Sequence, residues 1–94
     1  MAYVITHFFE GGTADQYDVV VKAAHPGGVL PAGQSYHVSG PTDGGWLVVA
    51  VWDSKETYDR FMSETLMPAL SQVSGRFDGM PQQREAEVTN LVTG

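Results

Sequence analysis

The chain has 94 residues, a net charge of −6 and no cysteine. That length allows one domain, which buries little surface by itself and is marginally stable unless a partner helps, and the missing cysteines exclude disulfides and thiolate chemistry. The only fixed cations are Lys22, Lys55, Arg60, Arg76 and Arg84, too few for the basic surface that nucleic acids or anionic membranes require, so we predict neither as a partner.

The first part of the chain predicts a strand followed by a helix. The segment Ala2–Phe9 is rich in β-branched and aromatic residues and ends before two glycines, as strands do. Thr13 and Gln16 have the spacing of a capping box, in which each side chain bonds the other residue's backbone at a helix start. His25 precedes Pro26, and the residue before a proline is pushed out of the helical region, so we expect the helix to end there.

Two strands joined by a turn follow. Ser35–Gly40 is short, and Pro41–Gly45 is a cluster of turn residues. Trp46–Trp52, with the sequence WLVVAVW, is the strongest strand of the chain. The two strands are close enough in sequence to form a hairpin.

The last part predicts a second helix, a long excursion and a final strand. We expect Asp53 to cap the helix, with Glu56 completing a capping box, and Pro68 to kink the helix or end its regular part near Met67. Residues 71–83 contain two glycines and a proline and read as an excursion. Arg84–Val92 alternates between apolar and polar residues and is the expected last strand.

The predicted fold is therefore a single α+β domain over residues 1–94, with the ferredoxin-like order β-α-β-β-α-β. Its antiparallel sheet should carry both helices on one face. The strand Trp46–Trp52 is apolar on both of its faces, yet one helix layer covers one face only. We therefore predict a homodimer in which a second copy covers the other sheet face through a two-fold axis.

Several segments carry a resemblance to a known family. They are Gly11-Gly12-Thr13, the Tyr36–Pro41 strand and turn, Gly45-Trp46, the run from Val51 through Ser54 to Tyr58, Asp59 and Phe61, and Leu66-Met67-Pro68. Over nearly its whole length the chain resembles the dimeric α+β barrel superfamily, and more narrowly its small members near the antibiotic biosynthesis monooxygenase group. The resemblance implies two sheets closed into one barrel with the helices outside. It is specific for fold and weak for activity, because this superfamily hosts oxygenases, cyclases, isomerases, haem-degrading enzymes and proteins without a known role.

Two of the three histidines, His37 and His7, are the candidates for proton transfer. His37 lies in the middle of a strand and could act as a general base near neutral pH, or it could be a buried histidine that only hydrogen-bonds a neighbour. His7, on the first strand, is a second catalytic candidate. Packing at an interface, without a catalytic role, is the slightly favoured alternative for it. His25 is expected to cap the end of the first helix. A role for its loop as a lid over a pocket is the less favoured alternative.

Aromatic side chains and one amide are the candidates for substrate binding. Related proteins line a pocket between helices and sheet with such residues, although packing alone also explains any single aromatic residue. Asn90, on the expected last strand, could hold a substrate carbonyl or only satisfy an edge-strand backbone group. The candidate substrate-binding residues are Tyr36, Trp52, Tyr58, Phe61 and Asn90.

No cofactor is predicted. The histidines lack metal-ligand spacing, the second helix has no histidine of the kind that holds haem in related proteins, and no phosphate-binding glycine motif occurs. We expect a cofactor-independent enzyme of monooxygenase-like or cyclase- or isomerase-like type that acts on a small carbonyl-bearing or aromatic compound. The alternative is a non-catalytic ligand-binding or assembly domain. The start of the chain does not read as a signal peptide, so we predict a cytoplasmic protein.

Overall fold

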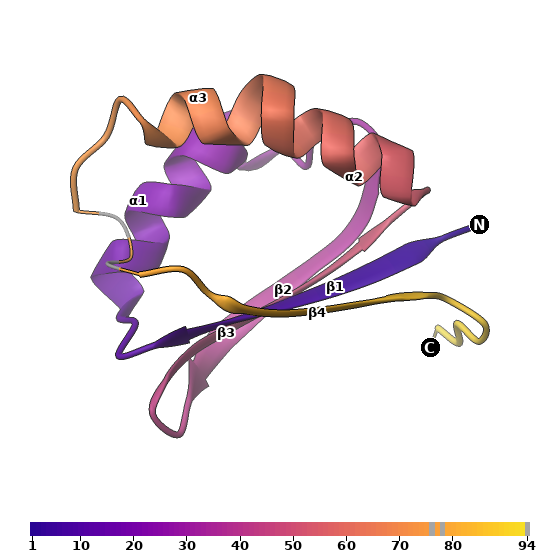
Figure 1. The fold of residues 1–94 in the computed structure, drawn as a ribbon, viewed down its shortest axis with the longest axis horizontal. Helices are drawn as coiled ribbons and strands as arrows, with labels where there is room; N and C mark the ends of the chain where they lie inside the picture. Colours follow the sequence, from indigo (N-terminus) through magenta and orange to yellow (C-terminus); the bar gives the residue numbers. More distant parts are fainter. Residues whose placement is uncertain (76, 78, 94) are drawn as a thin grey trace.

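The computed structural model describes residues 1–75, 77 and 79–93, and it has the predicted order of elements. Figure 1 shows one four-stranded antiparallel sheet with all the helices on one side of it. The elements are β1 (Tyr3–Glu10), α1 (Ala14–Ala24), the 3-10 turn η1 (Pro26–Gly28), β2 (Gln34–Thr42), β3 (Gly45–Trp52), α2 (Lys55–Phe61), the π-helical segment η2 (Met62–Leu66), α3 (Met67–Leu70) and β4 (Gln82–Glu87). Arg76, one of the five fixed cations, and part of the expected excursion lie outside the described residues. No described helix is long and apolar enough to cross a membrane.

The sheet order is β2-β3-β1-β4, with β2 and β4 at the two edges. The predicted hairpin is confirmed, but it is tighter than expected, because β2 continues to Thr42 and only Asp43 and Gly44 make the turn. Pro41 is thus a strand residue that pairs with Trp46. An edge strand tolerates proline because its outer side needs no backbone donor.

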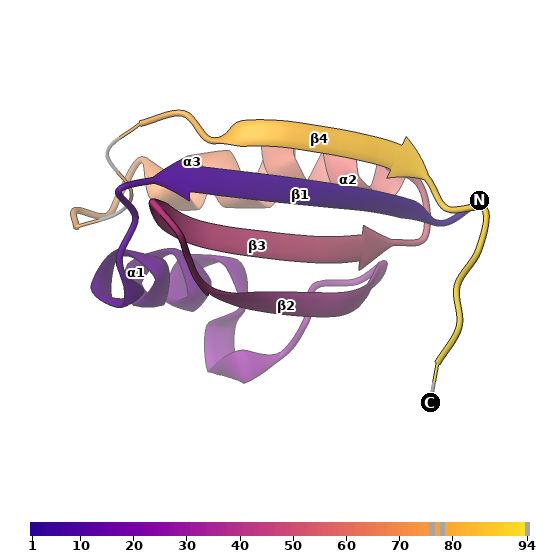
Figure 2. The ribbon, with the colours of Figure 1, turned by 90° about the horizontal axis from the view of Figure 1, so that it is seen from below.

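The core lies between the sheet and the helices, as the alternation along β3 requires. Ile5 and Trp52 are almost fully buried, with 0% and 2% of their surface exposed. The ring of Trp52 packs at 5.7 Å from Tyr58 and 5.1 Å from Phe61, measured between ring centroids, and so attaches α2 to the sheet. The opposite face of the sheet has no helix over it (Figure 2).

Both helix starts are capped by side chains, but only one as predicted. Thr13 and Gln16 form the expected capping box. At the second helix Ser54 is the cap and accepts from the backbone of Thr57, so the assignment to Asp53 was wrong. The backbone N–H of Asp53 donates to Gly33 at 2.7 Å, which keeps Asp53 in the extended chain that leaves the strand.

The second helix continues through Pro68 to Leu70 and is irregular before the proline, not after it. Met67 donates to the carbonyl of Met62, five residues back, which is the wider π-helical spacing. Proline has no N–H to offer the carbonyl four residues back, so a regular α-helical turn would lose a bond there in any case. The expected disruption therefore appears as one widened turn over Met62–Leu66.

β4 is shorter than predicted and shifted toward the start of the chain. It runs over Gln82–Glu87, and a single further bond joins the N–H of Val88 to the carbonyl of Ala2. Its partner β1 begins at Tyr3, so residues beyond 88 have no further strand to pair with. The expected strand over Arg84–Val92 is wrong in its second half.

Gly45 provides a test of the tight packing where β1, β2 and β3 meet. A Cβ added at Gly45 would overlap the carbonyl oxygen of Phe9, whereas one added at Gly40 would meet nothing within 4 Å. Gly45→Ala should therefore lower the free energy of unfolding by about 1–3 kcal/mol, as overpacking does. Gly40→Ala is the matched control and should stay close to wild type in urea denaturation. Equal denaturation midpoints for the two variants would contradict this account of the hairpin.

Candidate functional site

All three histidines of the chain gather on the helix-covered side of the sheet. His37 on β2 pairs with Ala50, and His7 on β1 pairs with Val48, and both partners are buried against the helices. Side chains of directly paired residues point to the same face of a sheet. His25 joins them from the end of α1, where it is the C-cap residue and only 7% exposed.

His37 forms a close pair with Tyr17 of α1. The Tyr17 hydroxyl lies 2.6 Å from Nε2 of His37, and the two rings are nearly parallel. The other ring nitrogen of His37, Nδ1, is buried and has no partner among the described residues. When Nε2–H donates to the tyrosine oxygen, Nδ1 carries the free lone pair of the imidazole.

The ring of His25 stands edge-on against His37, with 4.5 Å between the ring centroids. Burial lowers the pKa of His25, and the neighbouring Gln34 side chain opposes that effect in part. The pKa of His37 falls to about 4, chiefly because the ring is buried and secondly because His25 and His7 are close. Near pH 7 His37 is therefore neutral and able to accept a proton.

A cavity of about 530 Å³ opens beside this pair of histidines. It lies between the C-terminal half of α1, the η1 turn and the edge strand β2. Figure 2 shows these elements together at the β2 side of the sheet. Its lining residues are Val21, Lys22, His25, Gly27, Gly28, Leu30 and His37. The volume is in the range of small-molecule sites in proteins.

One more buried polar atom in this region lies without a partner among the described residues, Nε1 of Trp46. The Trp46 ring packs against Tyr17 at 5.2 Å, so its N–H belongs to the same region as His37. Buried polar groups are normally hydrogen-bonded, so an unpaired one is able to bind a ligand or water.

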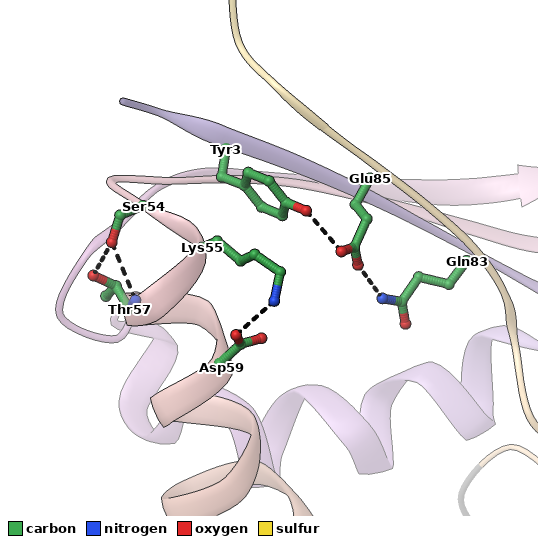
Figure 3. Close-up of polar contacts among 7 residues, drawn as sticks. All are labelled: Tyr3, Ser54, Lys55, Thr57, Asp59, Gln83 and Glu85. Atoms are coloured by element: carbon green, nitrogen blue, oxygen red, sulfur yellow. Dashed lines mark hydrogen bonds and ion pairs between the residues drawn. The ribbon is translucent and has the colours of Figure 1, made fainter.

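A second polar row crosses β1 and β4 beneath α2. His7 donates from Nε2 to Oε1 of Gln83 at 3.1 Å, and the hydroxyl of Tyr58 lies 3.5 Å from the same nitrogen. Figure 3 shows how the row continues, with Gln83 and the Tyr3 hydroxyl each donating to the carboxylate of Glu85. Burial lowers the pKa of His7 and raises the pKa of Tyr58 to about 12. Both groups are thus neutral near pH 7.

The structure separates the five predicted substrate-binding residues. Trp52, Tyr58 and Phe61 pack in or against the core, and Tyr58 also reaches His7. Tyr36 lies on the uncovered sheet face, 44% exposed and turned away from His37. Asn90 is exposed and lies beyond the end of β4, so its expected place on the last strand is wrong.

Tyr17 was not among the residues predicted for the site, although His37 was. The capping box at Thr13 provides the missing signal. Once the helix start is fixed, Tyr17 and Val21 lie one turn apart on the same helix face. That face is the one turned toward β2.

The described residues contain no group of three histidine or acidic side chains that could hold a metal ion. A second cavity of about 440 Å³ lies where β1 meets the start of α1, beside the stacked rings of Phe9 and Phe77. Its described lining contains no histidine. The first cavity is therefore the better candidate for a reactive site.

Comparison with solved structures supports the fold. A protein of Chloroflexus aurantiacus J-10-fl, provisionally assigned as an antibiotic biosynthesis monooxygenase, aligns with a TM-score of 0.70 and 16% identity over 99% of this chain and 98% of its own. A mutant of SnoaB, a cofactor-independent oxygenase from Streptomyces nogalater, aligns with a TM-score of 0.56 and 16% identity over 98% and 94%. No protein-family model and no curated protein matches the sequence. The resemblance stated from the sequence is confirmed at the level of the fold.

The low pKa of His37 predicts how stability changes with pH. His37 binds a proton near pH 6.5 in the unfolded chain and near pH 4 in the folded chain. Its contribution to the free energy of unfolding is therefore fully present above about pH 6.5 and is lost as the pH drops toward 4. His37→Gln removes this contribution, and the difference in unfolding free energy between pH 7 and pH 4.5 should become smaller. Urea denaturation at several pH values measures it. Tyr36→Phe, on the uncovered face, is the control, and an unchanged pH dependence in His37→Gln would show that His37 does not titrate this way.

Proposed function

We propose that the protein is a cofactor-independent, monooxygenase-like enzyme in which His37 accepts a proton from a small carbonyl-bearing or aromatic compound. The observation that carries the proposal is the pair of Tyr17 and His37 beside the 530 Å³ cavity. A neutral imidazole with one nitrogen held and the other unpartnered is arranged as a general base. The fold shared with two oxygenase-type proteins supports the class of reaction.

The proton transfer follows from the contacts of His37. With Nε2–H donated to the Tyr17 oxygen, Nδ1 takes a proton from an acidic C–H or O–H of the substrate. The electron pair of that bond stays on the substrate and delocalises into its carbonyl or ring. The Tyr17 oxygen, an acceptor 2.6 Å away, stabilises the imidazolium that forms.

The fate of the substrate anion sets the overall reaction. In a monooxygenase reaction the anion reduces O2, one oxygen atom becomes a new carbonyl oxygen on carbon, and the other leaves as water with the two hydrogens of the original methylene. Return of the proton to a different atom would give an isomerisation or cyclisation instead. His7, which is neutral and hydrogen-bonded to Gln83, is a second group that could return the proton to the substrate.

A specific observation favours a second candidate, a domain that binds a small ligand without reacting. A histidine with a pKa of about 4 is a weak base. No described carboxylate hydrogen-bonds any of the three histidines to strengthen it. Binding without proton transfer would occupy the same cavity, and the two functions differ in whether the acidic hydrogen of the ligand exchanges.

The proton-transfer proposal predicts that the protein accelerates the exchange of acidic hydrogens. With a panel of enolisable aromatic ketones in D2O, NMR should detect faster deuterium uptake, and an oxygen electrode should detect O2 consumption for a subset. His37→Gln should lower the rate by about 10²–10⁴-fold, the usual contribution of a general base. Tyr17→Phe should lower it less, because it removes the stabilising oxygen and leaves the base.

Tyr36→Phe, on the uncovered face, is the control and should retain activity. Binding of a panel compound with no exchange above the His37→Gln background would favour the binding domain and reject the enzyme.

We also infer that two copies associate through the uncovered sheet face. That face presents Tyr36, Val38 and Leu47 with 44%, 60% and 38% of their surface exposed. Half-buried apolar side chains continue it along the neighbouring strands, namely Val4, Phe8, Val49 and Val51. An apolar surface of this extent on a small domain marks an interaction site. The association of the protein with itself, like its cytoplasmic location, stays a prediction.

The dimer has a direct test. Val38→Lys places a charge in the middle of the uncovered face, and sedimentation should change from the mass of two chains to that of one at micromolar concentration. Glu64→Lys, at an exposed site on η2, is the control and should leave the dimer intact. A wild-type protein with the mass of one chain would contradict the inference.

A further inference from the structure

The cavity beside His37 differs in charge from the rest of the chain. The protein carries eleven acidic and five basic residues. Yet the cavity is lined by one lysine, two histidines and apolar or glycine residues, with no carboxylate among its described lining. A cavity with this lining attracts negative charge in a protein that otherwise repels it.

Lys22 is the fixed charge of this lining, and its ammonium group is not neutralised. It lies in the last turn of α1, and it forms no ion pair with any described residue. Asp18 is one turn earlier on the same helix, at a spacing that permits a pair, but no pair forms. Lys55 behaves differently, because its ammonium lies 2.8 Å from the carboxylate of Asp59 (Figure 3).

The remaining walls suit an apolar body of modest size. Val21 and Leu30 contribute apolar side chains. A Cβ added at Gly27 or Gly28 would meet no atom within 4 Å, so this side of the cavity is open. Lys22 and His37 come from different elements, α1 and β2, and both line the same space.

We propose that the cavity selects anionic substrates: the carboxylate, or an equivalent anionic group, binds Lys22, the apolar body packs on Val21 and Leu30, and the reacting hydrogen faces His37. The inference rests on the proposed function for the role of His37. The binding of the anion by Lys22 is a separate property with its own measurement.

An anionic substrate would also make His37 a better base. The groups that face His37 are His25, His7 and Tyr17, and no described carboxylate is among them. A substrate carboxylate in the cavity brings a negative charge close to the imidazole, and a nearby opposite charge favours the protonated form. Binding would thus raise the pKa of His37 from about 4 toward its ordinary range, so that the base strengthens when its substrate is present.

The test uses two probes of nearly equal size and shape that differ in charge, 1-hydroxy-2-naphthoate and the corresponding carboxamide. Titration calorimetry or naphthol fluorescence should show that wild type prefers the carboxylate. Lys22→Met should weaken binding of the carboxylate by about five- to tenfold and that of the carboxamide by less than about twofold, as expected for one partly exposed ion pair. Lys22→Arg should restore most of the loss. The preference should shrink between about 20 mM and about 500 mM NaCl.

Lys55→Met is the matched control, because it removes a lysine from another helix outside the lining, and it should leave both affinities unchanged. Equal weakening of the two probes by Lys22→Met, or a wild-type protein without preference for the carboxylate, would overturn the inference. Carboxylate binding that depends on Lys22, with no catalysed deuterium uptake by the enolisable ketones of the first panel, would instead support the anion site and reject the enzymatic function. Catalysed deuterium uptake by a ketone that bears a carboxylate, equal in wild type and Lys22→Met, would reject the anion site alone.

Discussion

The pairing of β1 with β3 is the constraint on which the rest of the molecule depends. Its register places Ile5 opposite Ala50 and Tyr3 opposite Trp52, and these four residues make most of the buried core. A shift by one residue would turn every side chain to the other face of the sheet. The same register fixes His7, and through β2 also His37, on the covered side. The register that packs the core therefore also places the reactive groups.

The position of the histidines on the covered side of the sheet also determines their charge. Burial under the helix layer disfavours the protonated forms of all three imidazoles, and at His37 the neighbouring His25 and His7 add to this effect. Tyr58, with a raised pKa, likewise stays in its neutral form. The groups that face His37 are polar and include no described carboxylate, and the fixed charge of Lys22 lies at the cavity beside them. Such a site responds strongly to the charge that a ligand brings.

The order of elements could be predicted from the sequence because each local signal agreed with the fold. The run of β-branched and aromatic residues in β3 and the capping box at Thr13 are such signals. The failures arise where distant contacts decide. Asp53 looks like a cap, but its backbone is bonded to Gly33. Residues 84–92 alternate like a strand, but β1 begins at Tyr3 and leaves the last of them without a partner.

The candidate site could be predicted in part for the same reason. Histidine on a strand was recognised as a proton-transfer group, since its chemistry is local. The contact between Tyr17 and His37 joins residues twenty positions apart and depends on how α1 crosses the sheet. Tyr36, although adjacent to His37 in sequence, lies on the opposite face because neighbouring residues of a strand alternate.

The two edges of the sheet limit how copies of this chain can add to one another. β2 carries Pro41, which offers no donor to an incoming strand, and β4 carries Arg84, Glu85 and Glu87, whose charges oppose flush strand addition. Growth of one continuous sheet from molecule to molecule is thus discouraged at both ends. The apolar surface is a face of the sheet, and in the dimer proposed above two such faces are related by a two-fold axis. Edges of this kind are compatible with that closed pair and oppose an open-ended fibre.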